Sequence, residues 1–190
     1  MCPLPPGGGE HPFGSYMQQV IDFDKPLIAA VNGVGVGFGL TVLLHCDLAV
    51  IAEGARLKLP FVSLGVVPEA ASSYLLPLQV GPQNAAEILY TADWVTSSRA
   101  VEIGLALREV PPEELMAEAN ALAARIAIHP PGSLRHTKRL VREGRIDAVR
   151  AARAREDAAF AVRVGTPENI EAITAFLEKR PADFSKIDSD

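Results

Sequence analysis

Residues 33–39 alternate glycine with larger residues, in the order Gly33-Val-Gly-Val-Gly-Phe-Gly39. The stretch follows an apolar run and precedes a helical run, so unpaired backbone N–H groups and the positive end of a helix dipole should meet there. Such a point binds a phosphate or stabilises a developing oxyanion. A dinucleotide-binding loop would need an acidic residue at the end of a second strand, whereas Glu53 falls in an expected turn. Glycines that merely allow a helix and a strand to pack closely remain an alternative.

Glu69 is the second residue that could do chemistry, because it stands between valines and alanines in residues 66–71. Burying a carboxylate is costly unless it is paired or protonated. Apolar surroundings also raise the pKa of a carboxyl toward the range of a useful general base. The structural alternative is a favourable charge in the first turn of a helix opened by Pro68.

Other polar residues carry weaker signals. We expect His45 to face a packed neighbour. Ser72 and Ser73 lack the Gly-x-Ser-x-Gly elbow of a serine nucleophile. The arginine-rich run 135–155, with its interleaved acidic residues, is typical of a solvated helix face rather than of a phosphate site. No metal-ligand cluster is expected, since the histidines are scattered at His11, His45, His129 and His136.

The elements that must position these residues follow from hydrophobic patterning. Apolar runs ended by turn residues predict strands, and i, i+3, i+4 spacing predicts helices. Strands are predicted over residues 26–31, 47–52, 57–59 and 106–110. Helices are predicted over residues 15–23, 40–45, 68–76, 84–90, 96–104, 112–128, 132–142, 147–163 and 167–179. Residues 1–14 are rich in Pro and Gly and are predicted to hold neither. The order predicts an α/β fold with a largely parallel sheet, followed by a helical region.

Composition excludes several classes of protein. The 190 residues carry a net charge of -5, which argues against a nucleic-acid partner. No apolar run is long enough to span a membrane. Cys2 and Cys46 are expected to be reduced thiols, and the first residues do not form a signal peptide, so we expect a cytoplasmic protein.

The segment Lys25-Pro-Leu-Ile-Ala-Ala-Val-Asn-Gly33, with Gly37 and Cys46-Asp47-Leu48, resembles the signature of the crotonase (enoyl-CoA hydratase/isomerase) superfamily. Further matches in the family's order extend over residues 25–186. Within them, Pro68-Glu69-Ala-Ala-Ser-Ser-Tyr74 is most similar to peroxisomal-type Δ3,Δ2-enoyl-CoA isomerases and their bacterial relatives.

The resemblance implies a crotonase-like ββα spiral in residues 25–110, after a Pro/Gly-rich stump and short helix in residues 1–24. Residues 111–190 would form a helical oligomerisation region, giving a homotrimer or hexamer. The backbone N–H of Phe38, after Gly37, would be one of two donors to the thioester oxygen of an acyl-CoA. The other donor belongs to an upstream turn that this sequence lacks, so we expect the spiral to be incomplete at its N-terminus and catalysis to be impaired.

The resemblance also bears on the reaction. Alignment places Thr41 and Phe61 where hydratases carry two glutamates, which argues against hydration of a double bond. A shift of the double bond needs one carboxylate, and Glu69 matches the isomerase base. Phe61, Gly37, Phe176 and Lys179 match positions that contact the acyl-CoA, although Lys179 could also be an ordinary exposed lysine. The implied enzyme is therefore an enoyl-CoA isomerase that needs no metal or other cofactor, since CoA arrives with the substrate. The alternatives are an enoyl-CoA hydratase and a non-catalytic crotonase-like fragment acting in assembly or binding.

Overall fold

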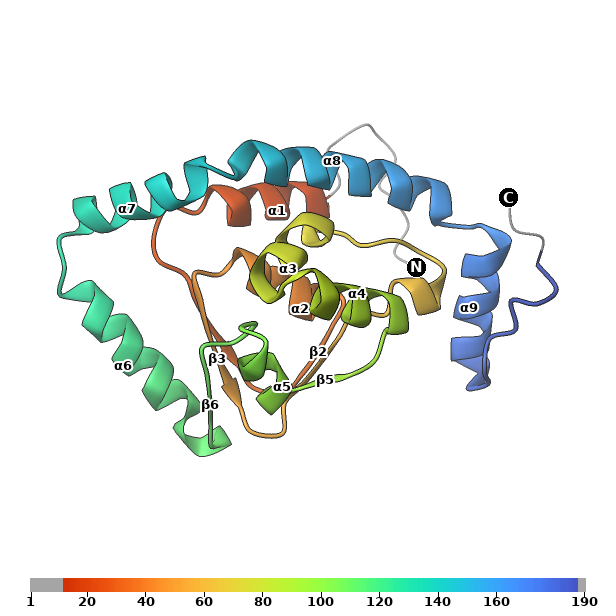
Figure 1. The fold of residues 1–190 in the computed structure, drawn as a ribbon, viewed down its shortest axis with the longest axis horizontal. Coiled ribbons are helices and arrows are strands. Elements are labelled where there is room, and N and C mark those ends of the chain that lie inside the picture. The colour runs from red at the N-terminus through yellow and green to blue at the C-terminus, as the bar shows by residue number, and fades with distance from the viewer. Residues whose placement is uncertain (1–11, 188–190) are drawn as a thin grey trace.

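The computed structural model describes residues 12–187. Strands and helices alternate up to Val110, and helices follow (Figure 1). The strands are β1 Ile28–Val31, β2 Val34–Val36, β3 Leu48–Ala52, β4 Arg56–Lys58, β5 Val95–Thr96 and β6 Arg108–Val110. The α-helices are α1 Pro12–Asp22, α2 Phe38–Thr41, α3 Ser72–Val80, α4 Pro82–Thr91, α5 Ser97–Glu102, α6 Leu115–Ala127, α7 Pro131–Glu143, α8 Ile146–Arg163 and α9 Pro167–Glu178. The short 3-10 helices are η1 Val42–His45, η2 Val62–Leu64 and η3 Pro112–Glu114.

The strands form two three-stranded sheets. In the first, β3 lies between β1 and β6 and runs parallel to both, with Ile28 opposite Leu48 and Val50 opposite Arg108. In the second, β2 and β4 are parallel, whereas β4 and β5 are antiparallel. The predicted α/β class is therefore confirmed, and the parallel pairs require the helical crossovers that the sequence provides.

β3 passes through the middle of the core, which explains its continuous apolar sequence. Ala49 and Ile51 face the larger core cluster, formed with α1, α2, α3 and α8. Val50 and Ala52 point to the opposite side and pack against Leu115 and other residues of α6. Alternate side chains of one strand thus fill two separate apolar layers.

The C-terminal helices form an outer belt around the strands (Figure 1). α6 covers one side, α7 and α8 continue along another, and α9 lies at the far end. α8 lies beside α1, where Arg150 pairs with Asp22 at 3.3 Å and Arg153 donates to the carbonyl of Gly14 at 3.0 Å. α7 is tied to the core by Lys138, whose Nζ lies 2.6 Å from Asp47 Oδ2. The division into residues 1–24, 25–110 and 111–190 stays a prediction.

Three local predictions are wrong. The first helix begins at Pro12 rather than at residue 15, because proline is tolerated in the first turn of a helix. The glycine stretch contains β2, which is too short for a periodic signal, and the two-residue β5 escaped notice for the same reason. The helix predicted from residue 68 begins only at Ser72, so Pro68 and Glu69 precede it. Cys2, His11 and most of the Pro/Gly-rich segment lie outside the described residues.

Candidate active site

The glycine stretch ends in a turn that presents a backbone N–H group. Gly37 adopts φ 55° and ψ −113°, a conformation that side-chain-bearing residues rarely adopt. Its N–H donates to the carbonyl of Lys58 at 2.9 Å, and its carbonyl accepts from the N–H of Thr41 at 3.0 Å. Phe38 is the first residue of α2, so its own N–H makes no intrahelical hydrogen bond. This N–H is available to an oxygen outside the helix.

The ring of Phe38 lies beneath α1. It makes edge-to-face contacts with Phe13 and Tyr16, at centroid distances of 5.4 and 5.6 Å. The side chain at the start of α2 is therefore held by aromatic rings of α1.

Glu69 lies in a tight turn between η2 and α3. Both residues after it, Ala70 and Ala71, have left-handed φ values of 59° and 61°. The carbonyl of Glu69 accepts from the N–H of Ser72 at 3.0 Å and from its hydroxyl at 2.6 Å. The half-buried Glu69 therefore stands before the helix and outside its first turn, in contrast to the structural alternative raised from the sequence.

The surroundings of Glu69 favour its protonated form. Burial raises the pKa of the Glu69 carboxyl, and the carboxylates of Glu156 and Asp157 on α8 raise it further. A carboxyl with a raised pKa is a stronger base once it is ionised, which suits it to remove a proton from carbon.

Two side chains from distant elements hold the turn that follows Glu69. Glu156 accepts hydrogen bonds from the N–H of Ala71 at 2.5 Å and from the N–H of Ser73 at 2.7 Å. From the other side, His45 Nε2 donates to the carbonyl of Ala70 at 2.7 Å. His45 does face a packed neighbour, as expected, and burial lowers its pKa.

Glu156 is the residue that the sequence analysis missed. The run 135–155 and its acidic neighbours were interpreted as a solvated face, but Glu156 is only 5% exposed and Lys138 only 8%. The sequence does contain a sign that Glu156 is buried. Val149, Ala152 and Glu156 follow helical spacing, so the glutamate falls on the apolar stripe of α8. A carboxylate in such a stripe requires hydrogen-bond donors, which the start of α3 supplies.

Thr41 and Phe61 are both buried. Thr41 is fully buried on α2, and its Oγ1 has no hydrogen-bond partner among the described residues. Phe61 is 5% exposed and belongs to the core cluster against which Phe38 packs. The two positions that the resemblance matches to hydratase glutamates are therefore a buried hydroxyl and a buried aromatic ring.

Phe176 and Lys179 lie on and just after α9. Phe176 is 74% exposed and lines a groove of about 500 Å³ together with Val36, Lys58 and Trp94. Val36 directly precedes Gly37, so the groove adjoins the turn that presents the Phe38 N–H. Lys179 ends α9 with a left-handed φ of 55°, and its exposed side chain does not line this groove.

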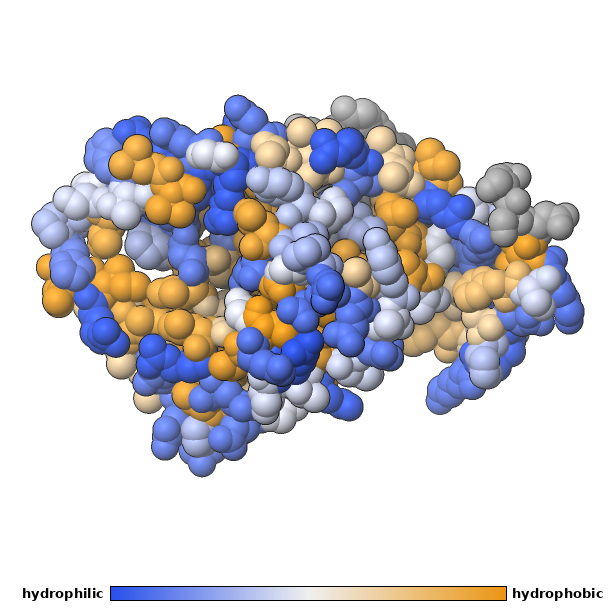
Figure 2. Space-filling view, viewed as in Figure 1, coloured by the Kyte–Doolittle hydropathy of each residue, from blue (hydrophilic) through white to orange (hydrophobic). Residues whose placement is uncertain are grey.

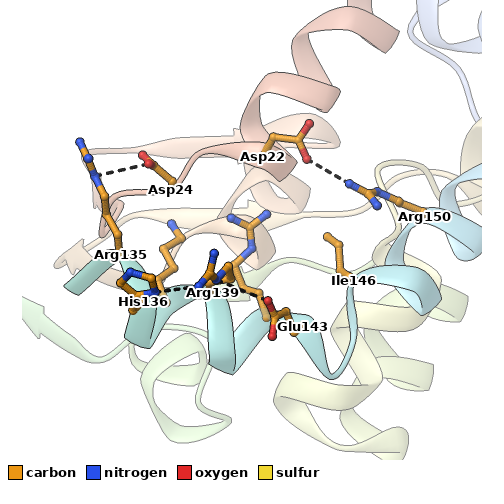
Figure 3. A pocket seen from close by; sticks show the side chains of 10 residues that line it. Asp22, Asp24, Arg135, His136, Arg139, Glu143, Ile146 and Arg150 are labelled. Carbon is orange, nitrogen blue, oxygen red and sulfur yellow. Dashed lines mark hydrogen bonds and ion pairs between the residues drawn. The ribbon is translucent and has the colours of Figure 1, made fainter. Parts of the chain in front are cut away.

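A second pocket, of about 460 Å³, lies among charged side chains of α7, α8 and the segment after α1 (Figure 3). Three of its arginines form local ion pairs, and the fourth, Arg142, donates to the carbonyl of Phe23 at 2.8 Å. The ion pairs drawn are Arg135 with Asp24 at 3.4 Å, Arg139 with Glu143 at 3.4 Å and Arg150 with Asp22 at 3.3 Å. The acidic partners offset much of the positive charge, so these contacts fasten the helices rather than create a strong anion site.

Within residues 12–187, no group of three or more His, Cys, Asp or Glu side chains is placed to hold a metal ion. Over the same residues, no helix combines the length and the apolar character that crossing a membrane requires.

The comparisons with known proteins agree with the geometry. A model of the enoyl-CoA hydratase/isomerase family matches residues 9–187. The crotonyl-CoA hydratase of Syntrophomonas wolfei is 38% identical over 176 residues, covering 90% of this chain and 68% of the relative. The 2,3-dehydroadipyl-CoA hydratase of Escherichia coli is 36% identical, covering 85% and 64%. Enoyl-CoA delta isomerase 2 of Rattus norvegicus is 33% identical, covering 87% and 42%. The chain thus spans 64–68% of the length of these two bacterial relatives.

A solved structure of an enoyl-CoA hydratase/isomerase from Pseudoalteromonas atlantica superposes with a TM-score of 0.86 at 37% identity, covering 89% of this chain and 68% of that one. The resemblance to crotonases and the crotonase-like fold are therefore confirmed. The matched family model, the sequence relatives and the superposed structure lead to one conclusion: the chain belongs to the enoyl-CoA hydratase/isomerase family.

Proposed function

We propose that this chain shifts the double bond of an enoyl-CoA from Δ3 to Δ2. The proposal rests on the placement of Glu69. This residue precedes α3 in a turn that Glu156 holds by hydrogen bonds, and its surroundings raise the pKa of the Glu69 carboxyl. The absence of a carboxylate at Thr41 and Phe61 supports a reaction that needs one acid–base group instead of two.

The proposed reaction is a proton transfer within one substrate. The Glu69 carboxylate removes a proton from C2 of the 3-enoyl thioester, and the electrons of that C–H bond move toward the thioester oxygen. The Phe38 N–H donates to this oxygen and stabilises the dienolate. The protonated Glu69 then returns the proton to C4, which leaves a double bond between C2 and C3 and restores the carboxylate. The sequence of steps requires no metal or redox cofactor.

The substrate class follows from family membership, and we propose that the chain binds an acyl-CoA. The groove along α9 adjoins Gly37 and is lined by Lys58 and by the exposed ring of Phe176. A nucleotide has phosphates that can pair with the Lys58 ammonium and a flat base that can stack on the Phe176 ring. We propose that Phe176 contacts the CoA nucleotide inside this groove. Lys179 lies outside the groove, and we propose that its exposed side chain reaches the edge of the bound nucleotide.

Hydration of a 2-enoyl-CoA is the second candidate, because the two bacterial relatives described above are named as hydratases. A role in assembly without catalysis is the third. Exposed apolar side chains on α7, among them Leu140 and Val141, support self-association as a homotrimer or hexamer in either case.

A direct comparison of rates tests the proposal. The purified protein should convert a 3-enoyl-CoA to the conjugated 2-enoyl-CoA much faster than it hydrates a 2-enoyl-CoA. Glu69→Gln should lower the isomerase turnover by about 10²-fold or more, the scale of a positioned acid–base group. The exposed Glu87 on α4 offers a matched control, and Glu87→Gln should leave turnover unchanged. Dominant hydration would favour the hydratase, and normal turnover by Glu69→Gln would remove Glu69 from the mechanism.

A further inference from the structure

The turn that carries Glu69 is not held in shape by its own residues alone. Two consecutive alanines occupy left-handed conformations, each of which costs about 1–2 kcal/mol relative to an ordinary conformation. Ala70 and Ala71 are both fully buried, so water cannot satisfy the backbone groups that the turn leaves open. Hydrogen bonds from outside the turn must therefore offset the strain.

Glu156 supplies the acceptors. One of its carboxylate oxygens lies 2.5 Å from the N–H of Ala71, and the other lies 2.7 Å from the N–H of Ser73. Ala71 is the N-cap of α3, and its side chain makes no capping hydrogen bond. A carboxylate from α8 thus takes the place of the missing cap and sits at the positive end of the α3 dipole. It binds two backbone groups at once, which fixes the orientation of the turn.

The same carboxylate acts on Glu69 through space. Three charged or titratable side chains face the turn: Glu156 and Asp157 from α8, and His45 from η1. Arg142, Arg145 and Arg153 act in turn on His45, whose lowered pKa leaves its ring neutral at neutral pH. The charges that raise the pKa of Glu69 therefore come from α8 alone.

We propose that Glu156 is a positioning residue for the base Glu69: its carboxylate, held by the N–H groups of Ala71 and Ser73, fixes the left-handed turn that aims Glu69 at its substrate. The proposal deepens the proposed function and rests on it. Glu156 does not touch the reacting atoms in this role. It sets where the base stands, and its negative charge raises the pKa of that base.

Glu156→Gln tests the positioning role because glutamine keeps the shape but has a single acceptor oxygen. One of the two N–H groups loses its partner, and the turn should loosen. We expect isomerase turnover to fall by about 10- to 100-fold, the cost of a small misplacement of a reacting group, with KM changed by less than about 2-fold. The acidic limb of the pH–rate profile should move to lower pH, since removal of a negative charge lowers the pKa of Glu69.

Asp157→Asn is the matched control. It removes the neighbouring charge. Asp157 is 55% exposed and pairs with Arg153 at 3.6 Å, and it makes no hydrogen bond to the turn within residues 12–187. This variant should also move the acidic limb to lower pH while retaining full turnover on the high-pH plateau. Equal turnover of Glu156→Gln and Asp157→Asn on the high-pH plateau would show that Glu156 acts through its charge alone, and would overturn the proposal.

Two measurements do not depend on turnover. Amide hydrogen exchange should be slow at Ala71 and Ser73 in the unmodified protein and in Asp157→Asn, and faster at one or both in Glu156→Gln. Carbon-13 NMR of the glutamate carboxyls should show the pKa of Glu69 falling in both variants. Unchanged protection of both amides in Glu156→Gln would contradict the proposal even if catalysis were lost.

A second variant covers the case in which Glu156→Gln fails to fold. Glycine adopts the left-handed conformation without strain, so Ala71→Gly combined with Glu156→Gln should restore the folded protein. Turnover of the double variant should remain at least about 10-fold below that of Ala71→Gly alone. Equal turnover would overturn the positioning role. Glu69→Gln distinguishes failure of this inference from failure of the proposed function. Normal turnover of Glu69→Gln would show that Glu69 is not the catalytic base, whatever the effect of Glu156→Gln.

Discussion

Ala70 and Ala71 show how much of a site can depend on backbone conformation. Their left-handed φ values place Glu69 outside α3, although the sequence around them has good helix formers. A reading of residue types alone extends the helix back to Pro68, since nothing in Ala-Ala-Ser-Ser signals a left-handed turn. The contacts that stabilise the turn come from His45 and Glu156, far away in the sequence.

The raised pKa of Glu69 predicts how activity depends on pH. A base acts in its ionised form, so turnover should fall as pH decreases through the pKa of Glu69. Since burial, Glu156 and Asp157 all raise that pKa above the ordinary 4.5, the loss should begin at a higher pH than for an exposed glutamate. Isomerase rates measured across mildly acidic pH, with the folded state monitored by circular dichroism, check this expectation. An acidic limb at or below the ordinary value would show that Glu69 is not the titrating base.

At the scale of elements, hydrophobic periodicity predicted most of the fold. The strands β1 and β3 and the helices α6 and α8 lie where apolar spacing placed them, because each packs side chains into one or both core clusters. β2 and β5 could not be predicted from periodicity, since two or three residues hold no repeat.

The candidate site likewise contains residues that local sequence reveals and one residue that it does not. Local patterns pointed to the glycine stretch 33–39 and to Glu69, because glycine spacing and an isolated carboxylate are visible within a short window, and the resemblance to crotonases then singled out Gly37 and Phe38. Glu156 required knowledge of which side of α8 faces the turn, and its partners lie 85 and 83 residues away. Contacts over such separations depend on tertiary packing, which a window of sequence does not contain.

Gly65 allows α9 to dock, and its replacement gives a prediction for this element. Gly65 has φ 67°, and an added Cβ would lie 2.8 Å from the backbone N of Asn169. Gly65→Ala should therefore destabilise the protein through both backbone strain and collision with α9. Gly54→Ala is the control, because Gly54 has φ 78° but open space around it.

Denaturant unfolding separates the two contributions. Gly54→Ala should lower the free energy of unfolding by about 1 kcal/mol from backbone strain alone. Gly65→Ala should cost at least about 1 kcal/mol more, the usual scale for crowding in a packed site. Equal losses for the two variants would mean that α9 does not approach Gly65 as closely as described.

At the scale of the whole molecule, Lys138 fastens the helical belt to the strands. Its Nζ binds Asp47 Oδ2 at 2.6 Å and the carbonyl of Lys25 at 2.7 Å, and Asp47 also accepts from the N–H of Leu27 at 2.7 Å. Lys138→Met would leave Asp47 without its charged partner. Because the Asp47 side chain is 31% exposed and water can replace part of the lost contact, we expect a loss of about 1.5–2 kcal/mol in the free energy of unfolding.

Arg139→Met provides the comparison on the same helix. Arg139 pairs with Glu143 at 3.4 Å, with both side chains more than half exposed, and should lose less than about 1 kcal/mol. Chemical denaturation of both variants measures the difference. Similar stabilities would show that the Lys138–Asp47 pair does not tie α7 to the core.

Apolar surface gathers along α6 and α7 (Figure 2), which leads to a prediction about self-association. Leu140 is 69% and Val141 65% exposed on α7, and Ile128 at the end of α6 is 79% exposed. Lysine at both Leu140 and Val141 should lower the assembly state, because burial of these groups between copies becomes costly. Light scattering coupled to size exclusion measures the mass. Tyr90→Lys, at a 77% exposed site on α4, should leave it unchanged. Equal mass for all three proteins would exclude this face as the contact.

The distance along the chain between Ala71 and Glu156 also fixes when the site can form during synthesis. A ribosome adds about 5–20 residues per second, so roughly 4–17 seconds pass between the emergence of the two partners, which are 85 residues apart. Throughout that interval the nascent chain contains Glu69 but lacks the acceptors that shape the turn after it. The turn therefore cannot gain its hydrogen bonds to Glu156 until α8 has left the exit tunnel, long after Ala71 itself was made.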